Sequence, residues 1–203
     1  MSTPFAPDAD VTALRRAVAW VALFNFAYFF VEFSVALSID SVSLFADSVD
    51  FLEDTAVNIL ILVALGWSAR KRATVGILLA AVLLAPGIAT LWTAWQQFSS
   101  PVVPDPEALS LTGFGALCVN VFCAALLVRF RNTSGSLTRA AYLSARNDAY
   151  ANIAIIAAGF ATSFANSHWP DLVVGLGIFL MNLDAAREVY EEALKEHHAH
   201  ARS

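Results

Sequence analysis

The stretch SLFADSVDFLEDTAVNILILVALGW at residues 43–67 places acidic side chains inside an apolar run that is long enough to cross a bilayer. Asp47, Asp50, Asp54 and Asn58 follow one another at steps of three, four and four residues. At about 100° per residue, these steps put the four side chains on one face of a helix. A carboxylate near the middle of a bilayer costs several kcal/mol unless it faces protein, water or a counter-ion. The stretch therefore predicts a membrane-spanning helix with a cation-binding face.

The composition extends this prediction to the whole chain. Of its 203 residues 58% are hydrophobic and 14% are charged, against about 25% charged in an ordinary soluble protein. We therefore expect an all-α polytopic membrane protein embedded in a lipid bilayer, with no nucleic-acid partner. Residues 1–187 would form a transmembrane domain, and 188–203 a short polar cytoplasmic tail. The hydropathy predicts six transmembrane helices, near 13–37, 43–67, 74–98, 108–129, 141–165 and 170–187.

The positions of the cationic residues predict the orientation. Eleven of the twelve Lys and Arg residues precede the first span, follow the sixth, or lie in the loops that join spans two to three and four to five. The other three loops contain none. The positive-inside rule then places both termini in the cytoplasm, and we expect the protein in the cell membrane.

A second polar face occurs in span five. Ser144, Asp148 and Asn152 are spaced by four residues, so they share one side of a helix. By depth, Asp148 approaches the level of Asp50 and Asp54. The two helices together would offer three carboxylates and neutral oxygens, which is an all-oxygen donor set suited to a divalent cation.

Other polar residues in the spans leave more than one interpretation open. Glu32 shares a face with Asn25 and could line an outward cavity, whereas Asp47 could relay ions; either could instead be a structural hydrogen-bonding group. Arg146 projects away from Asp148, so we do not expect it to neutralise the site. The cysteines, Cys118 and Cys123, are expected to be buried packing thiols.

Three segments resemble the cation diffusion facilitator family. The segment VEFSVALSIDSVSLFADSVDFLEDTAVN is similar to the end of helix one and the start of helix two in that family, and LSARNDAYAN is similar to its metal-binding motif in helix five. HWPDLVVGLGIFL resembles the opening of helix six. The resemblance covers all six spans in order.

The resemblance implies a transporter that exports zinc, manganese, iron or cobalt from the cytoplasm in exchange for protons. Asp50, Asp54 and Asp148 would be three of its metal ligands, and Ser144 occupies the position of the family's usual histidine. Serine is a weak ligand, so Asn147 or water is an alternative donor. Asp47, Asn58, Asn152 and Glu32 would line the pathway or support the ligands. The family's usual cytoplasmic dimerisation domain has no counterpart after residue 187, so we expect a short form of the family. A homodimer and a monomer are both compatible with the sequence.

Competing hypotheses follow from the same residues. A metal sensor or partner subunit would keep the fold and bind ions without moving them, and a channel would conduct them without coupling to a pH gradient. An intramembrane aspartyl protease is disfavoured, because the residue directly after GLG at 175–177 is Ile178 and not an aspartate. We therefore expect no enzyme and no cofactor other than the transported metal ion, and the leading hypothesis is an antiporter that works by alternating access.

Overall fold

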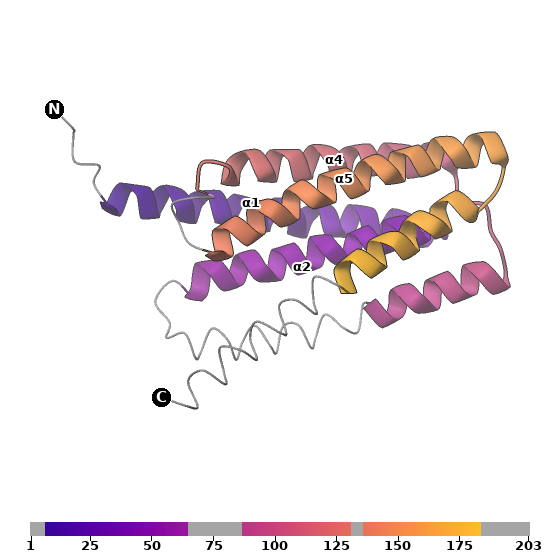
Figure 1. Cartoon of the computed structure of the whole chain (residues 1–203), viewed down its shortest axis with the longest axis horizontal. Helices are drawn as coiled ribbons and strands as arrows, with labels where there is room; N and C mark the ends of the chain where they lie inside the picture. The colour runs from indigo at the N-terminus through magenta and orange to yellow at the C-terminus, as the bar shows by residue number, and fades with distance from the viewer. Residues whose placement is uncertain (1–6, 65–86, 131–135, 184–203) are drawn as a thin grey trace.

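The computed structural model describes residues 7–64, 87–130 and 136–183, and every regular element in these ranges is an α-helix (Figure 1). Helices occur at all six predicted positions, so the all-α prediction is confirmed. Residues 74–86 of the third predicted span and the tail at 188–203 lie outside the described residues. The helices are α1 (Pro7–Ser38), α2 (Val42–Ala64), a helix at 87–99, α4 (Pro106–Leu127), α5 (Ser136–Ala165) and Trp169–Leu183.

The apolar character differs between these helices. Among the described residues, Val11–Ser38 and Pro106–Leu127 are long and apolar enough to cross a membrane on length and composition alone, and Trp169–Leu183 is apolar but shorter. α2 is long enough too, but four acidic residues interrupt its apolar sequence. Three of them, Asp47, Asp50 and Asp54, are buried inside the bundle.

Neighbouring helices run antiparallel along one common axis (Figure 1). α1 packs along α2, and α4 packs along α5. Arg16 and Arg129 lie at one end of the bundle, which we call the arginine end. The connection from α1 to α2 at 39–41 marks the opposite end, which we call the turn end.

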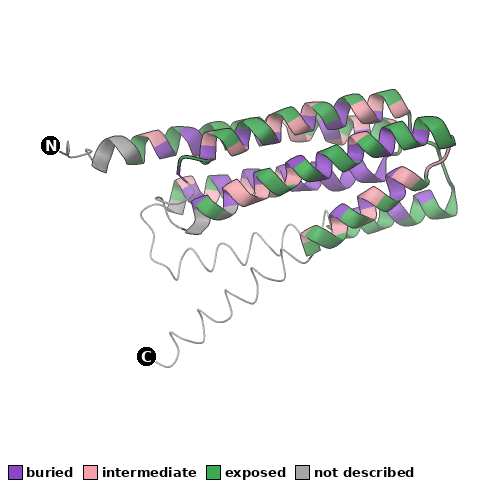
Figure 2. Ribbon diagram, turned by 45° about the horizontal axis from the view of Figure 1, so that its top comes forward, coloured by how far each residue is buried: buried purple, intermediate pink, exposed green. Residues whose placement is uncertain are grey.

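Apolar residues form buried clusters toward both ends of the bundle. Val18, Val21 and Leu127 belong to the cluster at the arginine end, and Leu44 and Ile155 to one toward the turn end. Exposed residues follow the outward faces of the helices (Figure 2). Many of them are large and apolar, such as Phe30, Leu111 and Phe160. An apolar exterior around a partly polar interior is the arrangement expected of a bundle in lipid. Cys123 is buried as predicted, but Cys118 is exposed on the outer face of α4, so that part of the prediction is wrong.

Two polar residues fix the turn end. Asp40 has a positive φ of 54°, a conformation that aspartate tolerates better than most residues, and this allows the chain to reverse between α1 and α2. The Gln97 side-chain amide donates to the backbone carbonyl of Asp40 at 2.9 Å and to that of Val102 at 2.7 Å. The end of the helix at 87–99 is thereby attached to the turn between α1 and α2.

A buried aspartate from the last described helix caps the start of α2. The carboxylate of Asp171 accepts hydrogen bonds from the hydroxyls of Ser41 and Ser43, at 2.7 and 2.5 Å, and from the backbone N–H groups of Val42 and Ser43, at 2.7 and 3.2 Å. At Gly175, an added Cβ would lie 2.7 Å from the backbone carbon of Val42, so only glycine permits this approach. These contacts hold Trp169–Leu183 against α2 and fix how far α2 extends into the bundle.

Candidate metal centre

The acidic face of α2 points into the bundle. Asp47, Asp50, Asp54 and Asn58 have exposed fractions of 0, 7, 5 and 1%. The three- and four-residue spacing therefore gives one buried polar face, as the sequence predicts. Glu53, next to Asp54 in sequence, is only half-buried and lies off this face.

Asp54 joins three helices. Its Oδ1 accepts a hydrogen bond from the hydroxyl of Ser144 on α5 at 2.9 Å, and its Oδ2 accepts one from the amide of Asn25 on α1 at 3.2 Å. The thiol of Cys123 on α4 in turn contacts Asn25, at 3.6 Å from its side-chain oxygen Oδ1. Ser144 therefore reaches the carboxylate that the sequence assigns as its co-ligand.

Asp50 is held from another direction. Its Oδ1 accepts a hydrogen bond from the side-chain amide of Asn182 on the helix Trp169–Leu183. The two carboxylates most strongly predicted as ligands are thus each bound by neutral donors from a different helix. Neutral donors satisfy a carboxylate without competing with a cation for its charge.

Asp148 lies near both of these carboxylates. Ser144 contacts Asp54, and α5 runs antiparallel to α2, so one turn along α5 brings Asp148 to the level of Asp50. The carboxyl group of Asp148 is close enough to those of Asp50 and Asp54 to interact with them electrostatically. Three carboxyl groups from two helices therefore lie near one another, those of Asp50 and Asp54 buried and that of Asp148 half-buried.

These side chains do not close around a point in the described conformation. Within residues 7–64, 87–130 and 136–183, no three Asp, Glu, His or Cys side chains are arranged to hold one metal ion together. Asp50 and Asp54 are each turned toward their amide or hydroxyl donor, and their mutual repulsion favours that separation. The ligand set Asp50, Asp54, Asp148 and Ser144 stays a prediction, and it requires rotation of these side chains.

The remaining predicted residues divide into two groups. Asn58 lies on the same face of α2 and donates to the backbone carbonyl of Asp54 at 2.7 Å, while Glu32, Asp47 and Asn152 are fully buried. Asn147 is exposed and accepts a hydrogen bond from Arg146 at 3.3 Å, so it does not join the buried group. Arg146 is itself exposed, which agrees with the expectation that it turns away from Asp148.

The sequence did not identify Asn25 and Asn182 as members of this group. From the sequence, Asn25 stood out only as a residue that shares a helix face with Glu32. A buried amide in an otherwise apolar helix is the available signal. Which carboxylate each amide meets depends on helix packing, which the sequence does not provide.

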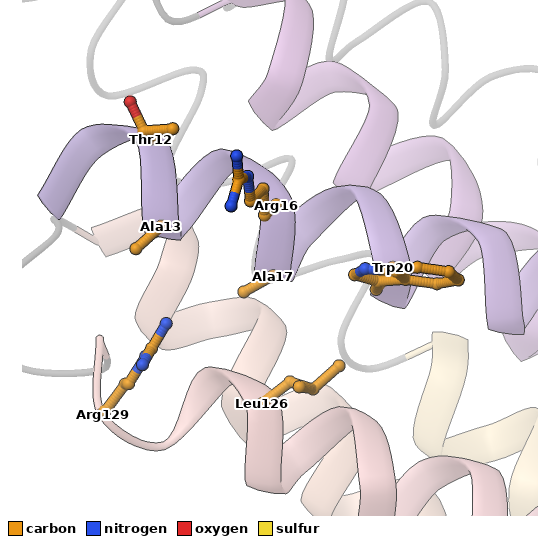
Figure 3. Close-up of a pocket in the computed structure, with 7 residues that line it drawn as sticks. All are labelled: Thr12, Ala13, Arg16, Ala17, Trp20, Leu126 and Arg129. Carbon is orange, nitrogen blue, oxygen red and sulfur yellow. The ribbon is translucent and has the colours of Figure 1, made fainter. Parts of the chain in front are cut away.

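A surface groove of about 490 Å³ lies between α1 and α4 at the arginine end (Figure 3). Arg16 and Arg129 line it together with Trp20 and Leu126. Arg16 lies nine residues before Asn25, or about 13 Å along α1 from the level of Asp54. Two guanidinium groups would repel a cation, so this groove is not the metal centre.

The helical bundle with its apolar exterior and enclosed carboxylates defines an integral membrane protein that handles cations. The chain matches the model of the cation efflux transmembrane domain over residues 18–196, and it therefore belongs to that family of transporters. No individual curated protein matched the sequence. The resemblance identified from helices two, five and six is thus confirmed at the level of the family, and the protein is a cation transporter.

Proposed function

We propose that the protein exports a divalent transition-metal ion from the cytoplasm in exchange for protons. The observation that carries the proposal is the hydrogen bond from Ser144 to Asp54, since it sets the register in which Asp148 faces Asp50 and Asp54. Three carboxyl groups and a hydroxyl on two helices are then near one another, and rotation of their side chains would bring them around one ion, which supports an all-oxygen site. The arginine end would face the cytoplasm, in accordance with the positive-inside rule.

The donor set bears on which metal is carried. Carboxylate, amide and hydroxyl oxygens suit harder ions such as Mn²⁺ or Fe²⁺, and imidazole is missing at position 144. Zinc also binds carboxylates in proteins, so Zn²⁺ and Co²⁺ stay among the candidate substrates.

Alternating access would connect this site to the two sides of the membrane in turn. Metal binding from the cytoplasm releases protons, because a ligating carboxylate must be ionised. When the site opens outward, protons compete for the same carboxylates and weaken their hold on the ion. Burial and the proximity of like charges both favour protonation of carboxyl groups, which suits such an exchange.

Metal flux into proteoliposomes under an imposed pH gradient tests this proposal. Zn²⁺, Mn²⁺, Fe²⁺ and Co²⁺ are compared side by side, with and without the gradient. We expect gradient-dependent uptake of at least one ion. Uptake that is indifferent to the gradient would indicate a channel, whereas binding without flux would indicate a sensor or partner subunit; either result would overturn the exchanger.

Replacing Ser144 with histidine should shift selectivity toward zinc. The Ser144 hydroxyl reaches Asp54 at 2.9 Å, so an imidazole on the same turn of α5 would lie within reach of an ion held there. Imidazole suits zinc better than manganese, and we expect the ratio of Zn²⁺ to Mn²⁺ flux to rise about tenfold. The measurement is competitive flux of the two ions. An unchanged ratio would mean that position 144 does not reach the ion.

A further inference from the structure

Two further carboxyl groups are buried beyond Asp50 toward the turn end. Glu32 on α1 and Asp47 on α2 both have exposed fractions of 0%. Among the described residues no amide or hydroxyl donor reaches any of their four carboxyl oxygens, and the two side chains lie close enough to share a proton with each other. Two carboxyl groups enclosed together inside a membrane protein are strongly destabilising when both are ionised, so the pair must hold a proton or bind a ligand that supplies positive charge.

The register of α1 against α2 brings these two groups to one level. The two helices run antiparallel, and they meet through the Asn25–Asp54 hydrogen bond and through ring contacts of Tyr28 with Phe51 and of Phe33 with Phe45. In the alignment of α1 with α2 that these three contacts define, the position of Glu32 lies opposite that of Asp47. The side chains of Glu32 and Asp47 lie within hydrogen-bonding reach of each other, in agreement with this placement.

α5 adds an amide at the same level. The Ser144–Asp54 contact pairs Asp148 with the position of Asp50, and a further turn brings Asn152 close to the level of Asp47. Asn152 is fully buried, and within residues 7–64, 87–130 and 136–183 neither its side-chain carbonyl oxygen nor its amide nitrogen has a hydrogen-bond partner. The amide of Asn152 thus adds a neutral oxygen donor from a third helix at the level of the two acids.

The described neighbours do not neutralise the two acids. Tyr28 lies near both carboxyl groups, but its hydroxyl donates to the backbone carbonyl of Thr112 at 2.7 Å. Arg146, the arginine of α5 nearest to this level, is exposed and donates to Asn147.

We propose that Glu32, Asp47 and Asn152 form a second binding site for the transported divalent cation. The site rests on the proposed function. Along α2, Asp47 lies about 5 Å from the level of Asp50 and about 10 Å from that of Asp54, on the side toward the turn end, so the second site would receive the ion after it leaves the first. Two carboxylates and an amide oxygen are hard donors of the kind that Mn²⁺ accepts.

Counting bound Mn²⁺ on the purified full-length protein by electron paramagnetic resonance tests the second site. We expect about two ions per chain in the unmodified protein and about one after the double replacement Glu32→Gln and Asp47→Asn, since amides retain the shape but lose the charge. Glu107→Gln removes an exposed carboxylate on α4 and serves as the matched control, with both ions retained. A single ion in the unmodified protein, or two in the double variant, would overturn the proposal.

Two further measurements keep the outcome clear. If the double variant does not fold, Asn152→Asp adds a third carboxylate, and we expect the weaker ion to bind about tenfold more tightly; unchanged binding would overturn the site. Asp54→Asn tests the first site separately. Loss of one ion in Asp54→Asn, with no effect of changes at Glu32 and Asp47, would leave the proposed function intact and remove only the second site. Uptake of protons by Glu32 and Asp47 without binding of a second Mn²⁺ ion would also overturn the second site.

Discussion

Replacing Asp54 with asparagine is expected to lower metal flux by more than about 100-fold. Loss of a residue that only hydrogen-bonds to a metal ligand already lowers metal affinity or activity by about 10- to 100-fold, and Asp54 is proposed as a ligand itself. Asp54 is the carboxylate at which α1, α2 and α5 meet, through Asn25 and Ser144. The replacement keeps the shape of the side chain but removes the charge that would bind a cation. Removing one of several neighbouring like charges also relieves repulsion, so the variant should fold and insert. Uptake of Mn²⁺ and Zn²⁺ into proteoliposomes measures the effect.

Glu53→Gln is the matched control for this experiment. Glu53 is adjacent to Asp54 on the same helix and loses the same charge, but it is only half-buried and lies off the acidic face. We expect metal flux in Glu53→Gln to stay within about twofold of that in the unmodified protein, since Glu53 is not among the residues that hold the proposed ligands in place. Equal flux in the two variants would show that the ion does not bind at Asp54, and the proposed centre would then be wrong.

The periodicity of α2 made its buried face predictable. Spacing along one helix determines which side chains share a direction, so the grouping of Asp47, Asp50 and Asp54 followed from the sequence alone. The same reasoning placed Ser144, Asp148 and Asn152 on one side of α5. Membership of the family then followed from the motifs on these helices.

Contacts between helices were not predictable in the same way. The amides of Asn25 and Asn182 bind Asp54 and Asp50 from helices that are far away in sequence. Their partners depend on the rotation and axial shift of each helix, and these are set by close packing such as that at Gly175. Similarly, Cys118 and Cys123 are five residues apart and point to different sides of α4, but only the packing shows which side is enclosed.

Replacing Asp171 with alanine is expected to destabilise the folded protein by about 3 kcal/mol, because several buried donors would lose their acceptor at once. The carboxylate serves Ser41, Val42 and Ser43 at the start of α2, where backbone N–H groups have no partner within the helix. The loss should appear as a lower unfolding temperature in detergent. Metal flux should fall as well, since Asp171 helps to set the axial position of α2 and hence of Asp50 and Asp54.

Asp105→Ala provides an internal standard for this effect. Asp105 caps α4 by accepting a hydrogen bond from the N–H of Ala108 at 2.7 Å. Unlike Asp171, it directly precedes the helix that it caps, and it is exposed. An ordinary cap of this kind is worth about 1 kcal/mol, so Asp105→Ala should cost about a third as much as Asp171→Ala. The difference would arise because water can replace the exposed acceptor, whereas the donors around Asp171 are enclosed between two helices. Equal losses in the two variants would show that water or another side chain reaches the start of α2, and that Asp171 does not fix its position.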